Sequence, residues 1–488
     1  MTFRVPPRRL RALVIALAAP LGAAAAQQDP AIMTRAKAIH ERVIKLDTHV
    51  DFSPGNMSDT PPNYVTGLRT QVDLPKMKAG YNGIFFSIYT GAGPLTPEGY
   101  DAAWKANVDK FEAVHKLATR MAPDQIEIAR TAADVRRIVR AGKLVALMGV
   151  ENGLGVGTDI TRVKKMADYG ARYISLVHNG HNQLSDSNNG EATNTWMHNG
   201  VSELGKQVVA EANKYGILLD ISHPSKASNL WVMANSKAPV IASHSSVRAL
   251  CTTASRNLDD EELQALKKNG GVIQTTAFAS YVNCTPAPSA QRTAALAALA
   301  TEFNIPVAAV GRGGGAGGGG RGAAPTRSAA CSIGDPPENP AAAAGRGAGA
   351  GRGAGAGAGG GRAGGGGRGN PVDAMDEATR ARFQTKLDAI NTQYPAPVTP
   401  RRANVEDFAN HIDYAVKLIG IDYVGISSDF DGGGGVDGYN CAPEAINVTY
   451  ELVKRGYTEE QIGKLWGGNL LRVMEKAEQV AKQLQAQK

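Results

Sequence analysis

The sequence Leu46-Asp47-Thr48-His49-Val50-Asp51 ends an apolar run that begins at Val43 and has the pattern of a β-strand. Alternate side chains of a strand point to the same side, so His49 and Asp51 can converge on one metal ion. A His-x-Asp pair alone is a weak signal, because it occurs by chance in many proteins. The interpretation therefore depends on residues further along the chain.

Five further apolar runs end in a residue that can bind a metal or transfer a proton. These residues are Glu151 after 144–150, His178 after 173–177, His223 after 217–222, His244 after 240–243 and Asp429 after 423–428. Helical patterns separate the runs, as a parallel barrel requires. Functional groups at the carboxyl ends of successive strands are typical of a (β/α)8 barrel active site. We therefore predict an α/β fold, a (β/α)8 TIM barrel with these residues at its mouth.

One long tract interrupts the alternation of strands and helices. Residues 285–372 are rich in Ala, then in Gly, Ala and Arg, and such a composition buries too little apolar area to offset backbone entropy. We predict a disordered insertion in a surface loop, where added length costs little. The predicted organisation is a signal peptide at 1–26, barrel strands one to seven at 27–284, the insertion at 285–372, and the eighth strand with C-terminal helices at 373–488.

The N-terminus has the pattern of an export signal. Four arginines precede the apolar run 12–21, and Ala24-Ala25-Ala26 provides a small-residue cleavage site. An uncleaved membrane anchor is the alternative, but the run is short for a bilayer span. We expect a periplasmic or secreted protein with no membrane anchor after signal removal.

The net charge of +8 comes from two segments. The first 26 residues hold four arginines, and 311–370 holds seven arginines against two acidic residues. The rest of the chain is near neutral, so no basic face for nucleic acid is expected. A Gly/Arg-tract nucleic-acid-binding protein is the remote alternative; the sparse arginines and the lack of aromatic residues in the tract argue against it.

Seven short segments together carry a family resemblance. They are Asp47-Thr48-His49-Val50-Asp51, Glu151, His178-Asn179, Asp220-Ile221-Ser222-His223, Ser243-His244-Ser245-Ser246, Ser255-Arg256-Asn257 and Ser428-Asp429-Phe430-Asp431-Gly432. This ordered set resembles the membrane (renal) dipeptidase family of zinc metallopeptidases, within the amidohydrolase superfamily. The resemblance covers about 43–284 and 403–475, and we do not expect the C-terminal lipid anchor of that family.

The resemblance implies a dinuclear metal centre. His49 and Asp51 would hold one Zn²⁺, His223 and His244 the other, and Glu151 would bridge them. Nitrogen and oxygen ligands without thiolate suit zinc, and Mn²⁺ or Co²⁺ would fit as substitutes. Two such ions can share a water and lower its pKa, which makes a bridging hydroxide available as the nucleophile.

The same resemblance implies the remaining roles. Asp429 would be the general base and then the acid, and His178 would stabilise the oxyanion. Arg256 would bind the C-terminal carboxylate of the substrate, and Tyr281 would be a further substrate contact. We expect an exported dipeptidase for short peptides, with C-terminal D-residues as one option. The alternative is another amidohydrolase activity, that of an N-acyl amino acid deacylase or a lactonase, on the same metal centre.

Several residues also have simpler interpretations. Arg256 could form a surface ion pair with Asp259 or Asp260, which lie close to it in sequence. We interpret His181 and His198 as loop residues, His411 as a surface residue and Asp431 as structural.

The expected partner is a small peptide substrate, and a homodimer is an open alternative to a monomer. The four cysteines of an exported chain can form disulfides. The resemblance implies a bridge between Cys251 and Cys284, and Cys331 pairs with Cys441 or stays free.

Overall fold

The computed structural model describes residues 28–310, 328–336, 371–372 and 374–487. The predicted signal peptide at 1–26 and most of the Gly/Arg-rich tract lie outside these residues. Among the described residues, no helix combines the length and apolarity needed to cross a bilayer.

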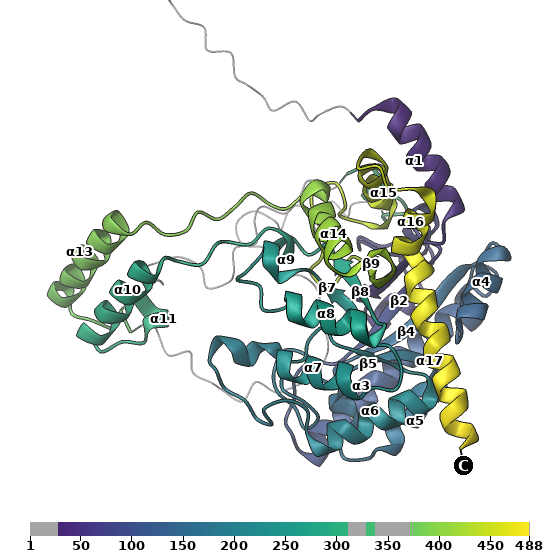
Figure 1. Ribbon diagram of the computed structural model, residues 1–488, viewed down its shortest axis with the longest axis horizontal. Helices are drawn as coiled ribbons and strands as arrows, with labels where there is room; N and C mark the ends of the chain where they lie inside the picture. The colour runs from purple at the N-terminus through teal and green to yellow at the C-terminus, as the bar shows by residue number, and fades with distance from the viewer. Residues whose placement is uncertain (1–27, 311–327, 337–370, 373, 488) are drawn as a thin grey trace, which may run out of the picture.

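Eight parallel strands form a nearly closed barrel with helices around it (Figure 1). In neighbour order they are β1 (Leu46–Val50), β2 (Gly83–Tyr89), β4 (Leu144–Glu151), β5 (Ala171–Ser175), β6 (Leu218–Asp220), β7 (Ile241–Ser245), β8 (Val272–Thr276) and β9 (Val424–Ser427). The first and last strands meet where Val50 pairs with Phe430, just after β9, and the Asp51 amide donates to the Phe430 carbonyl at 2.9 Å. The predicted TIM barrel is confirmed.

Parallel strands in a barrel are covered on both faces and are therefore buried. Every residue of β1, β4 and β7 is buried. A ninth strand, β3 (Ile126–Ile128), was not predicted. It pairs with 144–146 of β4, while β5 pairs with 148–150, so the two share one edge of β4 and β3 lies outside the closed order.

Helices follow the strands and cover the outside of the barrel (Figure 1). They are α2 (Leu74–Gly80), α3 (Pro97–Lys116), α4 (Ala132–Arg140), α5 (Thr161–Tyr169), α6 (Glu203–Tyr215), α7 (Lys226–Asn235), α8 (Asp260–Asn269), α9 (Ala279–Val282), α14 (Val405–Ile419), α15 (Ala445–Lys454), α16 (Glu459–Gly463) and α17 (Asn469–Ala486), with α1 (Pro30–Arg42) before the first strand. Local signals set their ends. In α8, Asp259 and Glu262 form a capping box, and Gly270 ends the helix with a φ of 82°.

The prediction of disorder throughout 285–372 is wrong for some of the residues that the structure describes in this range. α10 (Ala290–Glu302) and α11 (Val307–Val310) lie within it, and α13 (Glu377–Gln393) follows it. Leu299 of α10 shares a small core with Phe383 and Leu387 of α13. The Ala-rich run has high helix propensity, and α13 supplies the apolar surface that the run lacks alone. These helices stand apart from the barrel in Figure 1.

The segment 328–336, also within the predicted insertion, is fastened to the barrel. Cys331 forms a disulfide with Cys441, and the buried Lys76 pairs with Asp335 at 3.1 Å. The second disulfide joins Cys251 to Cys284, as the family resemblance implied. All four cysteines of the chain are therefore paired.

His411 is fully buried in α14, so its interpretation as a surface residue was wrong. His411 shares its helical face with Phe408, Ile412 and Ala415. The helical spacing of this position therefore predicted its burial better than the polarity of its side chain did. Its Nε2 donates to the Val282 carbonyl at 2.9 Å, and its Nδ1 accepts from the Val247 amide at 3.2 Å. Burial lowers the pKa of His411 to about 4.

We expect His411 to make the protein less stable as the pH falls. Its pKa of about 4 in the folded state lies below the roughly 6.5 of an unfolded histidine, so the unfolded chain takes up a proton first. This stability is present above about pH 6.5 and is lost toward pH 4, by up to about 1.4 kcal/mol per pH unit. Denaturant unfolding at several pH values should show a smaller loss in His411→Gln than in the wild type. Equal losses would contradict the assignment.

Candidate metal centre

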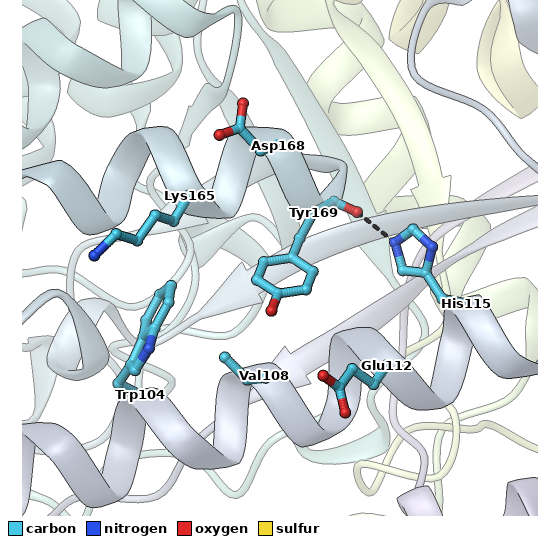
Figure 2. Close-up of a pocket in the computed structure, with 7 residues that line it drawn as sticks. All are labelled: Trp104, Val108, Glu112, His115, Lys165, Asp168 and Tyr169. Atoms are coloured by element: carbon cyan, nitrogen blue, oxygen red, sulfur yellow. Dashed lines mark hydrogen bonds between the residues drawn. The ribbon is translucent and has the colours of Figure 1, made fainter.

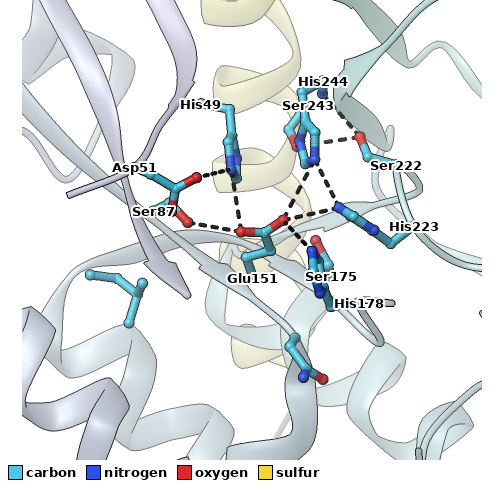
Figure 3. A network of polar contacts seen from close by, with 12 residues as sticks. His49, Asp51, Ser87, Glu151, Ser175, His178, Ser222, His223, Ser243 and His244 are labelled. Carbon is cyan, nitrogen blue, oxygen red and sulfur yellow. Dashed lines mark hydrogen bonds and ion pairs between the residues drawn. The ribbon is translucent and has the colours of Figure 1, made fainter. Parts of the chain in front are cut away.

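The predicted site residues meet at the carboxyl ends of the barrel strands. His49 lies near the end of β1, Glu151 ends β4 and His244 lies in β7, while His178 and His223 follow β5 and β6. Figure 3 shows Glu151 at the centre, with the four imidazoles around it. The parallel strands therefore bring together residues that are almost two hundred positions apart in sequence.

The two carboxylate oxygens of Glu151 face different imidazoles. Oε2 lies 3.3 Å from His49 Nε2. Oε1 lies 3.0 Å from His223 Nε2, 3.6 Å from His244 Nε2 and 3.5 Å from His178 Nε2. Glu151 is 3% exposed, and Ser87 Oγ donates to its Oε2 at 3.0 Å. The carboxylate thus lies between two groups of nitrogen ligands.

Asp51 and Asp429 form a second acidic edge beside His49. Their ligand atoms and that of His49 lie within 4.8 Å of one another. Asp429 has a φ of 59°, a left-handed conformation that Asp tolerates better than most residues. A Cβ on Gly432 would lie 2.3 Å from Asp51 Oδ2 and 2.4 Å from Asp429 Oδ1, so only glycine leaves room for both carboxylates.

A hydrogen-bond partner holds the Nδ1 atom of each histidine that the resemblance assigns to a metal. His49 Nδ1 lies 2.8 Å from Tyr173 Oη, His223 Nδ1 lies 3.2 Å from Asn179 Oδ1, and His244 Nδ1 lies 2.8 Å from Ser243 Oγ. Such contacts fix the ring and direct Nε2 to a metal.

Tyr173 is a site residue that the sequence analysis missed. It lies in β5 and reaches across the barrel to His49, 124 positions earlier. Gly149 makes this reach feasible, because a Cβ there would lie 1.9 Å from the Tyr173 ring. The only sign of Tyr173 in the sequence was its position at the start of a strand-like run, and this position did not indicate a contact with His49.

The carboxylates of the cluster differ in proton affinity. Burial raises the pKa of Asp429 to about 8, with Asp51 and Glu151 acting in the same direction and His49 opposing them. Burial also raises the pKa of Glu151, but His49 and His223 outweigh it and hold that pKa well below its usual value. Glu151 is therefore an anion at neutral pH, whereas Asp429 can take up and release a proton.

The donor set fits divalent metal ions. Burial lowers the pKa of His178, His223 and His244, which keeps these imidazoles in the neutral form that binds metals. His49 Nε2 is buried and faces Glu151 Oε2 at 3.3 Å and Asp51 Oδ2 at 3.7 Å. A set of imidazole nitrogens and carboxylate oxygens without a thiolate suits Zn²⁺, Mn²⁺ or Co²⁺.

Arg256 is buried at the cluster and does not form the alternative surface ion pair. It is 7% exposed; its Nη2 donates to His223 Nε2 at 3.1 Å, and its guanidinium lies 5.6 Å from the Tyr281 ring centre. Asp259 pairs with Lys226 instead. The hydrogen bonds of Arg256 go to neutral groups, so its charge remains available to an anion.

Asp431, interpreted as structural, and His181 and His198, interpreted as loop residues, have partners outside the metal-binding cluster. Asp431 accepts from the amides of Gln71 and Val72 at 2.8 and 3.1 Å. His181 pairs with Asp186 at 3.0 Å, and His198 contacts the Asn182 carbonyl at 2.8 Å. None of the three belongs to a candidate ligand group among the described residues.

A separate hollow of about 610 Å³ lies on the outer wall between α3 and α5 (Figure 2). Its lining is Trp104, Val108, Glu112, His115, Lys165, Asp168 and Tyr169, which includes none of the predicted site residues. His115 Nε2 is already bonded to the Tyr169 carbonyl at 2.7 Å. The chemistry therefore points to the barrel mouth and not to this hollow.

Comparisons with known proteins identify relatives of this chain. The family model described as membrane dipeptidase (peptidase family M19) matches residues 33–488. Dipeptidase aclJ of Aspergillus oryzae is 34% identical over 225 residues, or 45% of this chain and 52% of that protein. Dipeptidase verJ of Clonostachys rogersoniana is 33% identical over 211 residues, or 42% of this chain and 53% of that protein. The chain spans about half the length of these relatives.

Two solved structures resemble the whole barrel. The probable dipeptidase PvdM of Pseudomonas aeruginosa is 28% identical, with a TM-score of 0.63 over 92% of this chain and 99% of that one. A metallopeptidase of Rhodobacter sphaeroides, solved with a phosphinate mimic of the dipeptide L-Ala-D-Ala, is 18% identical with a TM-score of 0.58 over 89% of this chain and 99% of that one. The second likeness shows the fold alone.

In protein stripped of metal by a chelator, we expect Asp429 to lower stability as the pH rises. Its pKa of about 8 lies above the roughly 3.9 of an unfolded aspartate, so the folded state keeps a proton that the unfolded state has released. The free energy of unfolding should therefore fall between about pH 5 and pH 8, by up to about 1.4 kcal/mol per unit. Denaturant unfolding should show a shallower fall in Asp429→Asn, while the exposed control Asp109→Asn keeps the wild-type slope. A wild-type slope in Asp429→Asn would contradict the assignment.

Proposed function

The chain belongs to the membrane dipeptidase family, peptidase family M19, and from this premise we propose that it is an exported dipeptidase with two zinc ions per chain. The observation that carries the proposal is the position of Glu151 between His49 on one side and His223 with His244 on the other. This arrangement supports a bridging carboxylate between two metal sites.

Two bound metal ions would supply Lewis acidity, which lowers the pKa of water and polarises the substrate carbonyl. His49 and Asp51 would hold one ion and His223 and His244 the other, with Glu151 serving both. Mn²⁺ or Co²⁺ would suit the same ligands.

Asp429 moves the proton in the proposed reaction. Its carboxylate accepts a proton from the attacking water and delivers it to the nitrogen of the leaving amine. In the metal-free protein, burial raises the pKa of this carboxyl, which favours its uptake of a proton. His178 complements it: burial lowers its pKa, so the ring is neutral and can donate one N–H to the oxygen that becomes negative.

Arg256 sets the length of the substrate. A buried guanidinium with neutral neighbours favours a carboxylate, and the pair can form two parallel hydrogen bonds. Tyr281 flanks the guanidinium and would form one wall of this subsite. Because Arg256 Nη2 lies only 3.1 Å from His223 Nε2, a bound C-terminus would lie close to the scissile bond. This distance supports a dipeptidase over an enzyme for longer peptides.

The disulfides support export. Cys251–Cys284 and Cys331–Cys441 would persist in an oxidising compartment, such as the periplasm or the extracellular space. The predicted signal at 1–26 would provide the route.

One alternative activity also fits Arg256. An N-acyl amino acid presents the same carboxylate next to an amide bond, so a deacylase would use the site unchanged. A lactone lacks that carboxylate, which makes a lactonase the weaker alternative.

Metal analysis and a substrate panel should test the proposal together. We expect about two zinc ions per chain by elemental analysis, and hydrolysis of dipeptides with an L- or a D-residue at the C-terminus that stops when a chelator removes the metal. Dipeptides with a C-terminal D-residue are included because the Rhodobacter sphaeroides metallopeptidase was solved with a mimic of L-Ala-D-Ala. Turnover of N-acyl amino acids alone would favour the deacylase. A metal-free protein that keeps full activity would refute the proposal.

Arg256→Ala should chiefly weaken the binding of substrates with a free C-terminal carboxylate. Loss of a charged hydrogen bond costs about 1.5–3 kcal/mol, which corresponds to a rise in KM of roughly 10- to 150-fold. The matched amidated dipeptide should lose little further activity in the variant. Arg137→Ala is the control, because the exposed Arg137 pairs with Glu127 and Asp134 outside the cluster. An equal loss on both substrates would contradict the carboxylate clamp.

A further inference from the structure

Asp220 is a buried carboxylate that the proposed reaction does not use. It ends β6, is 2% exposed, and accepts five hydrogen bonds from three serines. Its Oδ1 accepts from Ser222 N (3.2 Å), Ser222 Oγ (2.8 Å) and Ser243 N (2.8 Å), and its Oδ2 accepts from Ser243 Oγ (2.9 Å) and Ser175 Oγ. The donors are hydroxyls and backbone amides, and none is a basic side chain.

The carboxylate connects two strand ends at the metal centre. Ser222 directly precedes His223, and Ser243 directly precedes His244. Ser222 Oγ, held by Asp220, also accepts from the His244 amide at 3.0 Å. One side chain therefore fixes the backbone before both imidazoles of the predicted second metal site.

The hydrogen bonds also determine which nitrogen of His244 carries a proton. Ser243 Oγ lies between Asp220 Oδ2 at 2.9 Å and His244 Nδ1 at 2.8 Å. A serine hydroxyl has one proton to donate, and only a donated proton makes the contact with the carboxylate favourable. Ser243 therefore accepts from Nδ1–H, and His244 Nε2 keeps its lone pair. That nitrogen lies 2.9 Å from His223 Nε2 and 3.6 Å from Glu151 Oε1 (Figure 3).

We propose that Asp220 is a positioning residue that, through Ser243, holds His244 with Nε2 as its metal-binding nitrogen. The inference rests on the proposed metal centre. It adds to that centre a relay, the hydrogen bonds from Asp220 through Ser243 to His244, which leaves the lone pair of His244 Nε2 free for a metal ion. Outer-shell contacts of this kind change metal affinity by about 10- to 100-fold when they are removed.

Asp220→Asn is a direct test, because the side chain keeps its size and shape while one hydrogen-bond acceptor is replaced by a donor. An amide nitrogen in place of Oδ2 would donate to Ser243 Oγ. The serine would then donate its proton to His244 Nδ1, and the proton of the imidazole would move to Nε2, where it blocks a metal. Ser243→Ala tests the same relay by removing the acceptor of Nδ1–H.

Ser175→Ala is the matched control. It removes a hydroxyl donor from the same oxygen, Asp220 Oδ2, but Ser175 has no hydrogen bond to an imidazole. The three variants would be purified as full chains, and their Zn²⁺ affinity measured by competition with a chromophoric chelator. Visible spectra of the Co²⁺-loaded proteins would report on the ligands, and denaturant unfolding of the metal-free proteins would report on stability.

We expect Asp220→Asn and Ser243→Ala to weaken the binding of one metal ion by about 10- to 100-fold and to change the Co²⁺ spectrum. Ser175→Ala should bind Zn²⁺ with wild-type affinity. This should hold even if Ser175→Ala and Ser243→Ala lower the free energy of unfolding by the same amount. Wild-type affinity and spectrum in Ser243→Ala, or an equal loss in Ser175→Ala, would overturn the relay and leave the metal centre in place. A wild-type protein that binds no divalent metal would instead overturn the metal centre itself, and the relay with it.

Discussion

The contact of one buried carboxylate, Glu151, with four imidazoles is the constraint on which the rest of the molecule depends. A carboxylate that is 3% exposed is costly to bury unless opposite charge or hydrogen bonds surround it. His49, His178, His223 and His244 provide those neighbours, and each comes from a different strand end. The barrel must close in the correct register before this set exists, so the site and the fold form together.

The barrel positions the imidazoles through contacts that lie below the site. Tyr173, Asn179 and Ser243 hold the Nδ1 atoms of three histidines, and Asp220 fixes Ser243. Small residues are part of the same arrangement, since Gly149 leaves space for the Tyr173 ring. Strands rather than loops therefore carry most of the residues that hold the imidazoles, since Tyr173, Asp220 and Ser243 lie in β5, β6 and β7.

The order of strands and the residues at their ends could be predicted from the sequence because the rule behind them is local. A parallel strand is an apolar run, and its carboxyl end lies at the mouth, so Glu151 and Asp429 could be placed without a structure. Contacts between distant residues could not be placed in this way. Nothing near Tyr173 indicates His49, and the proximity of Arg256 to Asp259 suggested an ion pair that the fold gives to Lys226. The helix α10 was missed for the same reason, because its apolar partner α13 lies beyond the Gly-rich tract.

The charge balance at the mouth connects stability with chemistry. Asp51, Glu151 and Asp429 lie together, and Arg256 is a basic side chain that touches the cluster. Burial of the Asp429 carboxyl opposes its ionisation, as its raised pKa shows, and apolar burial along the strands offsets the cost of placing these carboxylates inside the barrel. Divalent cations favour the ionised carboxylates, so their binding free energy adds to the free energy of folding. The groups that destabilise the mouth are therefore the groups that give it affinity for metal and a carboxyl able to exchange a proton near neutral pH.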